Sequence, residues 1–118
     1  MRGFEEIEII GHVGADAVMR YTPSGVPVTT FSVAVTKTWN DQAGQRQEKT
    51  KWFLVSCWRK LAETAAQYVT KGMLVMVRGE VDARAYTGKD GEQKVSLDLS
   101  ATKLQFLSGG KAGDEAED

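Results

Sequence analysis

Hydrophobic and polar residues alternate along most of the chain, and this pattern predicts β-strands with one buried face. The side chains predicted to point inward are, run by run, Ile7, Ile9 and Val13; Phe31, Val33 and Val35; Phe53, Val55 and Cys57; Met73, Val75, Val77, Val81 and Ala83; and Val95, Leu97, Leu99 and Ala101. The last run then changes parity to Leu104 and Phe106, which predicts a bulge near Thr102. Five strands follow from the pattern.

One stretch has a different period. Between Lys60 and Thr70 the hydrophobic residues recur at helical spacing, and the helix is expected to end at Gly72. Glycine-containing turns are predicted at residues 21–25, 40–44 and 87–91, and the glycines at 11 and 14 predict a bend or a close backbone approach. An all-β chain with one short helix between its third and fourth strands has the layout of a five-stranded Greek-key OB-fold barrel.

Length and composition indicate one globular domain. The chain has 118 residues, of which 42% are hydrophobic and 26% charged, and no apolar run approaches the roughly 20 residues of a membrane span. The first residues resemble neither a secretory signal nor a transit peptide, so a cytoplasmic location is expected. We predict a folded domain over residues 1–107 and a disordered acidic tail over residues 108–118.

The charge is unevenly distributed along the chain. The formal net charge is -1, but the tail accounts for -3 and the body for +2. A mildly basic body with an acidic tail is compatible with a polyanionic partner, although +2 alone establishes little. The acidic tail is expected to compete with such a partner for the basic face.

The sequence offers little for catalysis. It has one histidine, His12, one cysteine, Cys57, no GxSxG motif, no phosphate-binding loop and no convincing pair of carboxylates. Cys57 lies in an apolar strand pattern and is interpreted as a small buried side chain. We therefore predict a protein that is not an enzyme, with no catalytic residues, no cofactor and no metal.

All three tryptophans, Trp39, Trp52 and Trp58, lie among cationic residues between positions 36 and 59. Single-stranded nucleic acid suits such a surface, because bases stack on aromatic rings and phosphates attract cations; ordinary core or interface tryptophans are the alternative. Alternation places Trp52 and Trp58 together on the outer face, about 20 Å apart. The same alternation points Trp39 inward, unless the strand projects beyond the core or twists past a bulge at its end, while Tyr86 extends the outer aromatic surface.

Seven short motifs, in order and spacing, resemble bacterial-type single-stranded DNA-binding proteins. They are Ile10-Gly-His-Val-Gly14, Met19-Arg-Tyr21 with Gly25, Phe31-Ser-Val-Ala34, Thr50-Lys-Trp-Phe53, Lys60-Leu-Ala-Glu63, Tyr68-Val-Thr-Lys-Gly72 and Val77-Arg-Gly79. The resemblance implies that bases stack on Trp39, Trp52, Trp58 and Tyr86. Trp58 and Tyr86 stand where Phe and Trp, respectively, are common in the family, but both remain flat aromatic surfaces.

The resemblance also implies a function: sequence-nonspecific binding and protection of single-stranded DNA in replication, recombination and repair, in the bacterial nucleoid. Phosphates would then be neutralised by Lys37, Lys49, Lys51, Arg59, Lys60, Arg78, Arg84 and Lys89. An OB-fold module that binds protein or structured RNA is the alternative. Tryptophan fluorescence with oligo(dT), duplex DNA and folded RNA separates the two.

Members of this family form homotetramers or pseudo-tetramers, so a single barrel per chain implies a homo-oligomer, most simply a tetramer. Leu74 and Met76 are apolar residues on the predicted outer face of the fourth strand and are candidates for the subunit interface. A helix packed across that face is the alternative. Family members recruit replication and repair proteins through a hydrophobic pair at an acidic tip, and this sequence stops at Asp118 without that pair.

Overall fold

The computed structural model describes residues 2–108, which form six strands and one helix. In chain order the elements are β1 (Ile7–Val13), β2 (Val18–Tyr21), β3 (Pro27–Asn40), β4 (Arg46–Trp58), α1 (Lys60–Tyr68), β5 (Leu74–Thr87) and β6 (Gln93–Ser108). The short β2 was not predicted. The predicted tail lies outside the described residues, apart from Ser108, which ends β6.

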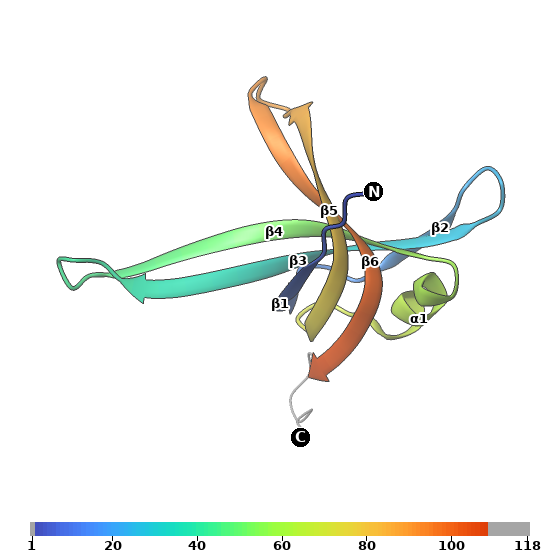
Figure 1. The fold of residues 1–118 in the computed structure, drawn as a ribbon, viewed down its shortest axis with the longest axis horizontal. Helices are drawn as coiled ribbons and strands as arrows, with labels where there is room; N and C mark the ends of the chain where they lie inside the picture. Colours follow the sequence, from blue (N-terminus) through green and yellow to red (C-terminus); the bar gives the residue numbers. More distant parts are fainter. Residues whose placement is uncertain (1, 109–118) are drawn as a thin grey trace.

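Five of the strands close into a barrel. The sheet order is β1-β5-β6-β4-β3-β2, and β1 pairs with β3 as well as with β5, which closes the ring. The β4–β6 pair is parallel and the other pairs are antiparallel, while β2 pairs only with β3. The predicted five-stranded OB-fold barrel with one helix is confirmed, and β2 is an addition to it (Figure 1).

The core holds the side chains that alternation pointed inward. Val33, Val55, Val75, Val77 and Leu99 are all at most 1% exposed. The helix is anchored to this core through its buried alanines, and the buried Thr29 hydroxyl donates a hydrogen bond to the Ala62 carbonyl over 2.7 Å. Cys57 is fully buried as predicted, and burial raises the pKa of its thiol to about 12, so the thiol remains protonated at neutral pH.

Two backbone irregularities close the barrel. A Cβ atom at Gly11 would collide with the Ala34 carbonyl, because β1 crosses from β5 to β3 at this point. In β6, Ala101 pairs with Gly79 and Lys103 pairs with Arg78, which leaves Thr102 as the extra residue of a bulge. The predicted close approach and the predicted bulge are both confirmed.

The β3–β4 and β5–β6 hairpins extend beyond the barrel as two arms (Figure 1). Ala83 and Val95, both predicted to point inward, are exposed because only the partner strand accompanies them there; Val95 is 64% exposed. Phe106 was also predicted to point inward. It is 37% exposed, and its ring lies 5.8 Å from that of Tyr68, outside the core.

Candidate nucleic-acid interface

Trp52 and Trp58 lie on the surface of β4 that faces away from the core. Trp52 pairs with Ala34 and Trp58 pairs with Val28, and residues directly opposite in an antiparallel register share a face. The two side chains are 54% and 44% exposed. The prediction that these two tryptophans are exposed on one face is confirmed.

This surface continues across β6 to β5. Leu54 of β4 pairs with Asp98 of β6, and further along the β5–β6 arm Arg84 pairs with Ser96 and Tyr86 with Lys94. Tyr86 is 42% exposed, and the Arg84 guanidinium carbon lies 5.6 Å from the centre of its ring. We use "outer face" for the surface formed by Trp52, Leu54, Trp58, Arg84, Tyr86 and Asp98.

Asp98 places a carboxylate on the outer face that sequence reasoning missed. Its Oδ2 accepts a hydrogen bond from Arg84 Nε over 2.9 Å, and its Oδ1 accepts one from the Ser96 hydroxyl over 2.6 Å. These contacts, with Arg84 first, hold the pKa of Asp98 below its ordinary value. Arg84, a predicted phosphate contact, is therefore already paired. Only the non-local β4–β6 register brings Asp98 beside Leu54, and the sequence gives no local signal of it.

The Trp52 ring packs over Gly14, which has no side chain. A Cβ atom at position 14 would lie 2.6 Å from Cζ3 of Trp52, so the indole occupies the space above Gly14. The ring is therefore supported on one side while it remains 54% exposed. Such a preset orientation lowers the entropy that is lost when a base stacks on the ring.

At the other end of β4, two arginines flank Trp58. Arg20 pairs with Val28, which in turn pairs with Trp58, so Arg20 shares the outer face. It was missed because β2 was not predicted. Arg59 follows Trp58 with φ 58° and ψ -123°, a region that favours glycine. Its N–H donates to the Pro27 carbonyl over 3.0 Å, and its own carbonyl accepts from Ala62 over 3.0 Å, which fixes this conformation.

Trp39 lies on the opposite side of the β3–β4 arm. Alternation assigned it correctly to the side of the core residues, and it is 48% exposed because the strand projects beyond the core, which was the alternative to inward burial. Lys37 pairs with Lys49 and Val35 with Lys51, so these lysines share its side. We use "inner face" for the surface formed by Trp39, Lys37, Lys49 and Lys51.

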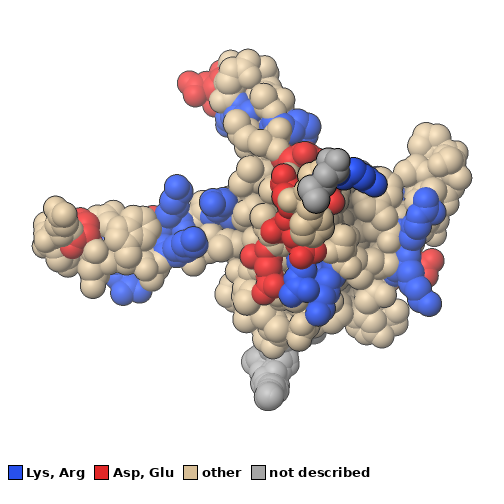
Figure 2. All heavy atoms as spheres, in the orientation of Figure 1, with Lys and Arg blue, Asp and Glu red and all other residues tan. Residues whose placement is uncertain are grey.

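The remaining predicted cations are dispersed. Arg78 donates to Glu8 Oε1 over 2.8 Å on the β1–β5 surface, away from both faces of the arm. Lys60 begins α1, and Lys89 lies in the turn of the β5–β6 arm. Figure 2 shows lysine and arginine side chains along the β3–β4 arm and acidic side chains gathered over the barrel. The predicted basic residues therefore do not form one continuous surface.

The predicted interface residues differ from expectation. Leu74 is half-buried and Met76 is only 6% exposed, although both have the outward parity. Met76 lies between Ile10 and Gln105, its partners in the flanking strands. The exposed apolar residue on this surface is Ile10, at 51%.

Residues 2–108 contain no group of three or more histidine, cysteine or carboxylate side chains placed to hold a metal ion. In the same part of the chain, no helix has the length and apolar character required to cross a membrane. The barrel topology and the position of the helix define an OB-fold protein.

Comparison with known proteins identifies the family. Residues 4–107 match the model of the single-strand binding protein family, and the chain belongs to this family. A single-stranded DNA-binding protein from Neisseria meningitidis is 44% identical over 104 residues, covering 88% of this chain and 60% of that protein. One from Chlorobaculum tepidum is 33% identical over 118 residues, covering 99% of this chain and 73% of the relative. The chain thus spans less than two thirds of the Neisseria protein.

Solved structures share the fold. A Plasmodium falciparum SSB in complex with single-stranded DNA superposes with a TM-score of 0.78 at 24% identity, over 92% of this chain and 98% of the other. A small single-stranded DNA-binding protein from Streptomyces coelicolor gives 0.75 at 27% identity, over 86% and 93%. Both similarities cover most of this chain.

Proposed function

We propose that this protein binds and protects single-stranded DNA without sequence preference. The observation that carries the proposal is the pair Trp52 and Trp58, half-exposed on one side of a barrel strand, with Tyr86 on the same outer face. Stacking on aromatic rings is tolerant of sequence because every base has a π-face. Membership of the single-strand binding family supports this proposal over a protein-binding or structured-RNA module.

In this mechanism, bases stack on Trp39, Trp52, Trp58 and Tyr86 while lysine and arginine side chains neutralise phosphates and release counterions. No step of the mechanism breaks or forms a covalent bond, so the protein is not an enzyme. Exposed single strands arise in replication, recombination and repair, and we place the protein in these processes, in the bacterial cytoplasm and nucleoid.

Intrinsic fluorescence tests the function directly, because all three tryptophans lie on the proposed faces. Titration with oligo(dT) at low salt is expected to quench the emission to saturation, and added salt to weaken the binding. Duplex DNA and a folded RNA of equal phosphate content serve as controls and are expected to quench far less. No quenching by oligo(dT) at low salt contradicts the proposal.

We also propose that the protein forms a homotetramer. Ile10, exposed beside the covered Met76 and half-buried Leu74, supplies an apolar surface on β1 and β5, and the exposed Tyr68–Phe106 pair supplies another. Light scattering at micromolar concentration is expected to give four times the chain mass of 12.9 kDa. A monomer mass contradicts this part of the proposal.

A further inference from the structure

The β5–β6 arm has a strand edge without a partner. β1 pairs with β5 only as far as Gly79, so within residues 2–108 the stretch of β5 from Glu80 to Thr87 has no partner strand on the side away from β6. Residues 3–5 and 80–82 line a cavity of about 460 Å³ at the first part of this edge. The backbone groups of such an edge can pair with a further strand.

This edge is acidic, and its charge is uncompensated. Glu80 and Asp82 are exposed, and neither forms an ion pair in the part of the chain that the structure describes. Asp82 pairs directly with Asp98 across the hairpin, and like charges directly opposite one another destabilise a pair of strands. Glu5 lines the same cavity. A cationic strand placed beside the edge would offset this repulsion.

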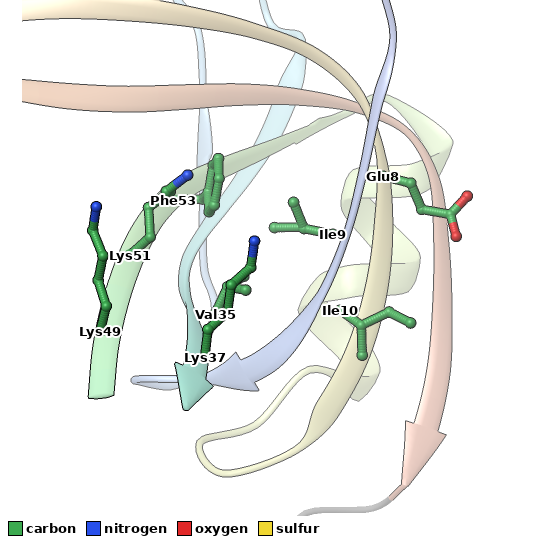
Figure 3. Close-up of a pocket in the computed structure, with 8 residues that line it drawn as sticks. All are labelled: Glu8, Ile9, Ile10, Val35, Lys37, Lys49, Lys51 and Phe53. Atoms are coloured by element: carbon green, nitrogen blue, oxygen red, sulfur yellow. The ribbon is translucent and has the colours of Figure 1, made fainter. Parts of the chain in front are cut away.

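The β3–β4 arm has a second unpaired edge, of opposite charge. β4 pairs with β6 only beyond residue 52, so residues 46–52 have no described partner strand on the side away from β3. Lys49 and Lys51 lie on this stretch and form no ion pair within residues 2–108. Lys37 pairs with Lys49 across the hairpin, which is again a like-charge pair. In Figure 3 the three lysine side chains extend to the same side of the arm, and the carboxylate of Glu8 points away from them.

The two edges match in spacing as well as in charge. Glu80 and Asp82 are separated by one residue, as are Lys49 and Lys51, so each pair lies on one side of its strand with its members about 7 Å apart. In an antiparallel pairing of the two edges, Glu80 meets Lys51 while Asp82 meets Lys49. The residue between each pair is uncharged. The two arms of one chain point in different directions (Figure 1), so the pairing requires two copies.

We propose that the unpaired edge of β5 binds the β3–β4 arm of a second copy of this protein, through backbone hydrogen bonds and two lysine–carboxylate pairs. Two β5 edges repel one another, and so do two β4 edges, so the contact joins unlike surfaces. Each copy then binds two neighbours, which builds a ring or an open chain of copies. The contact does not depend on DNA. That bound DNA would displace the arm, by occupying Lys49 and Lys51, is the one consequence that rests on the proposed function.

The test is a charge swap between two variants, followed by light scattering at low and high salt. E80K/D82K has two basic edges and K49E/K51E has two acidic ones, so neither variant should associate with itself through this contact. An equimolar mixture restores the contact, and its mean mass at low salt should be at least about twice that of either variant alone. Wild type should associate at low salt and lose the contact at high salt, because the Debye length falls from about 30 Å at 0.01 M to about 3 Å at 1 M.

E63K/E92K and K71E/K103E are matched controls, since each reverses two exposed charges outside both edges, and each should associate like wild type. All variants should have the wild-type mass at high salt, which checks the fold and the proposed tetramer. A wild-type mass that does not change with salt overturns the inference, and so does a mixture no heavier than its components. Neither result bears on DNA binding, which the fluorescence titration measures separately.

Discussion

The two faces of the β3–β4 arm share one backbone but differ in chemistry. The outer face has Trp52 supported above Gly14, Trp58 beside Arg20, and the Asp98 carboxylate paired with Arg84. The inner face has Trp39 and three lysines without ion pairs in residues 2–108. Strand alternation therefore places Trp52 and Trp58 on one side of β4, and Trp39 with the three lysines on the other.

On β3 and β4, side chains that point to the same side of the sheet are buried within the barrel and exposed along the arm. Within the barrel, Val33 and Val55 fill the core at 0% exposure. Further along the same two strands this parity holds Lys37, Lys49 and Trp39, which no third strand covers. A hairpin that extends past its barrel leaves the positions of core parity exposed to solvent.

The largest effect is expected from removing the outer platform in W52A/W58A. Each stack is worth roughly 1–3 kcal/mol, so the double variant should lose at least about 30-fold in affinity for short oligo(dT). Both side chains are about half-exposed, so the fold should persist, which circular dichroism checks. W39A is the matched control: it should bind the short oligonucleotide like wild type, and an equal loss in W39A would show that the two faces are not separate.

A smaller effect, in the opposite direction, is expected from D98N. Removing this carboxylate frees Arg84 and takes one negative charge off the outer face, which should strengthen oligo(dT) binding by about fivefold, or roughly 1 kcal/mol. S96A, which removes one hydrogen bond to Asp98 but keeps the charge, is the control and should bind like wild type. Weaker binding by D98N would instead show that the Asp98–Arg84 pair orients Tyr86 for stacking.

The Asp98–Arg84 pair should make the stability of the fold depend on pH. Because the pKa of Asp98 is lowered in the folded protein, its contribution to stability is complete above the ordinary value of 3.8 and is lost as pH falls through the lower folded value. The D98N variant should not show this loss of stability at acid pH. Arg84 is exposed and Asp98 is partly exposed, so solvent screens the pair and the difference in unfolding midpoint is expected to be small.

The smallest effect on affinity, but a clear one on stability, is expected from R59G. The backbone of Arg59 occupies a glycine-favoured region, which costs on the order of 1–3 kcal/mol, and glycine relieves it at the expense of about 0.5–1 kcal/mol of chain entropy. Thermal unfolding should therefore occur several degrees higher. Oligo(dT) binding should fall by about threefold as one cation beside Trp58 is lost.

R59K separates the two consequences of that substitution. Lysine keeps the charge and the strained backbone, so both the unfolding temperature and the affinity should remain near those of wild type. An R59G variant that unfolds at the same temperature as R59K would show that the surrounding hydrogen bonds to Pro27 and Ala62 already relax the strain.

The sequence predicted the barrel well because its core strands alternate cleanly, as at Val33, Val55 and Val77, and because Thr102 marks a change of parity. It failed where alternation continues beyond the core, at Ala83 and Val95, since parity specifies a side of the sheet but not what covers it. Alternation with the inward Leu97 and Leu99 points Asp98 outward, but its place beside Leu54 could not be predicted, because it depends on a parallel pairing of strands distant in sequence.

The most direct test of the two-face account uses single-tryptophan proteins. W52F/W58F retains only Trp39, and W39F/W58F retains only Trp52, and each is titrated with oligo(dT) of increasing length. We predict that Trp52 is quenched by the shortest oligonucleotides, whereas Trp39 is quenched only by longer ones that reach the inner face. Quenching of both tryptophans at the same shortest length, or no quenching of Trp39 at any length, would contradict the account.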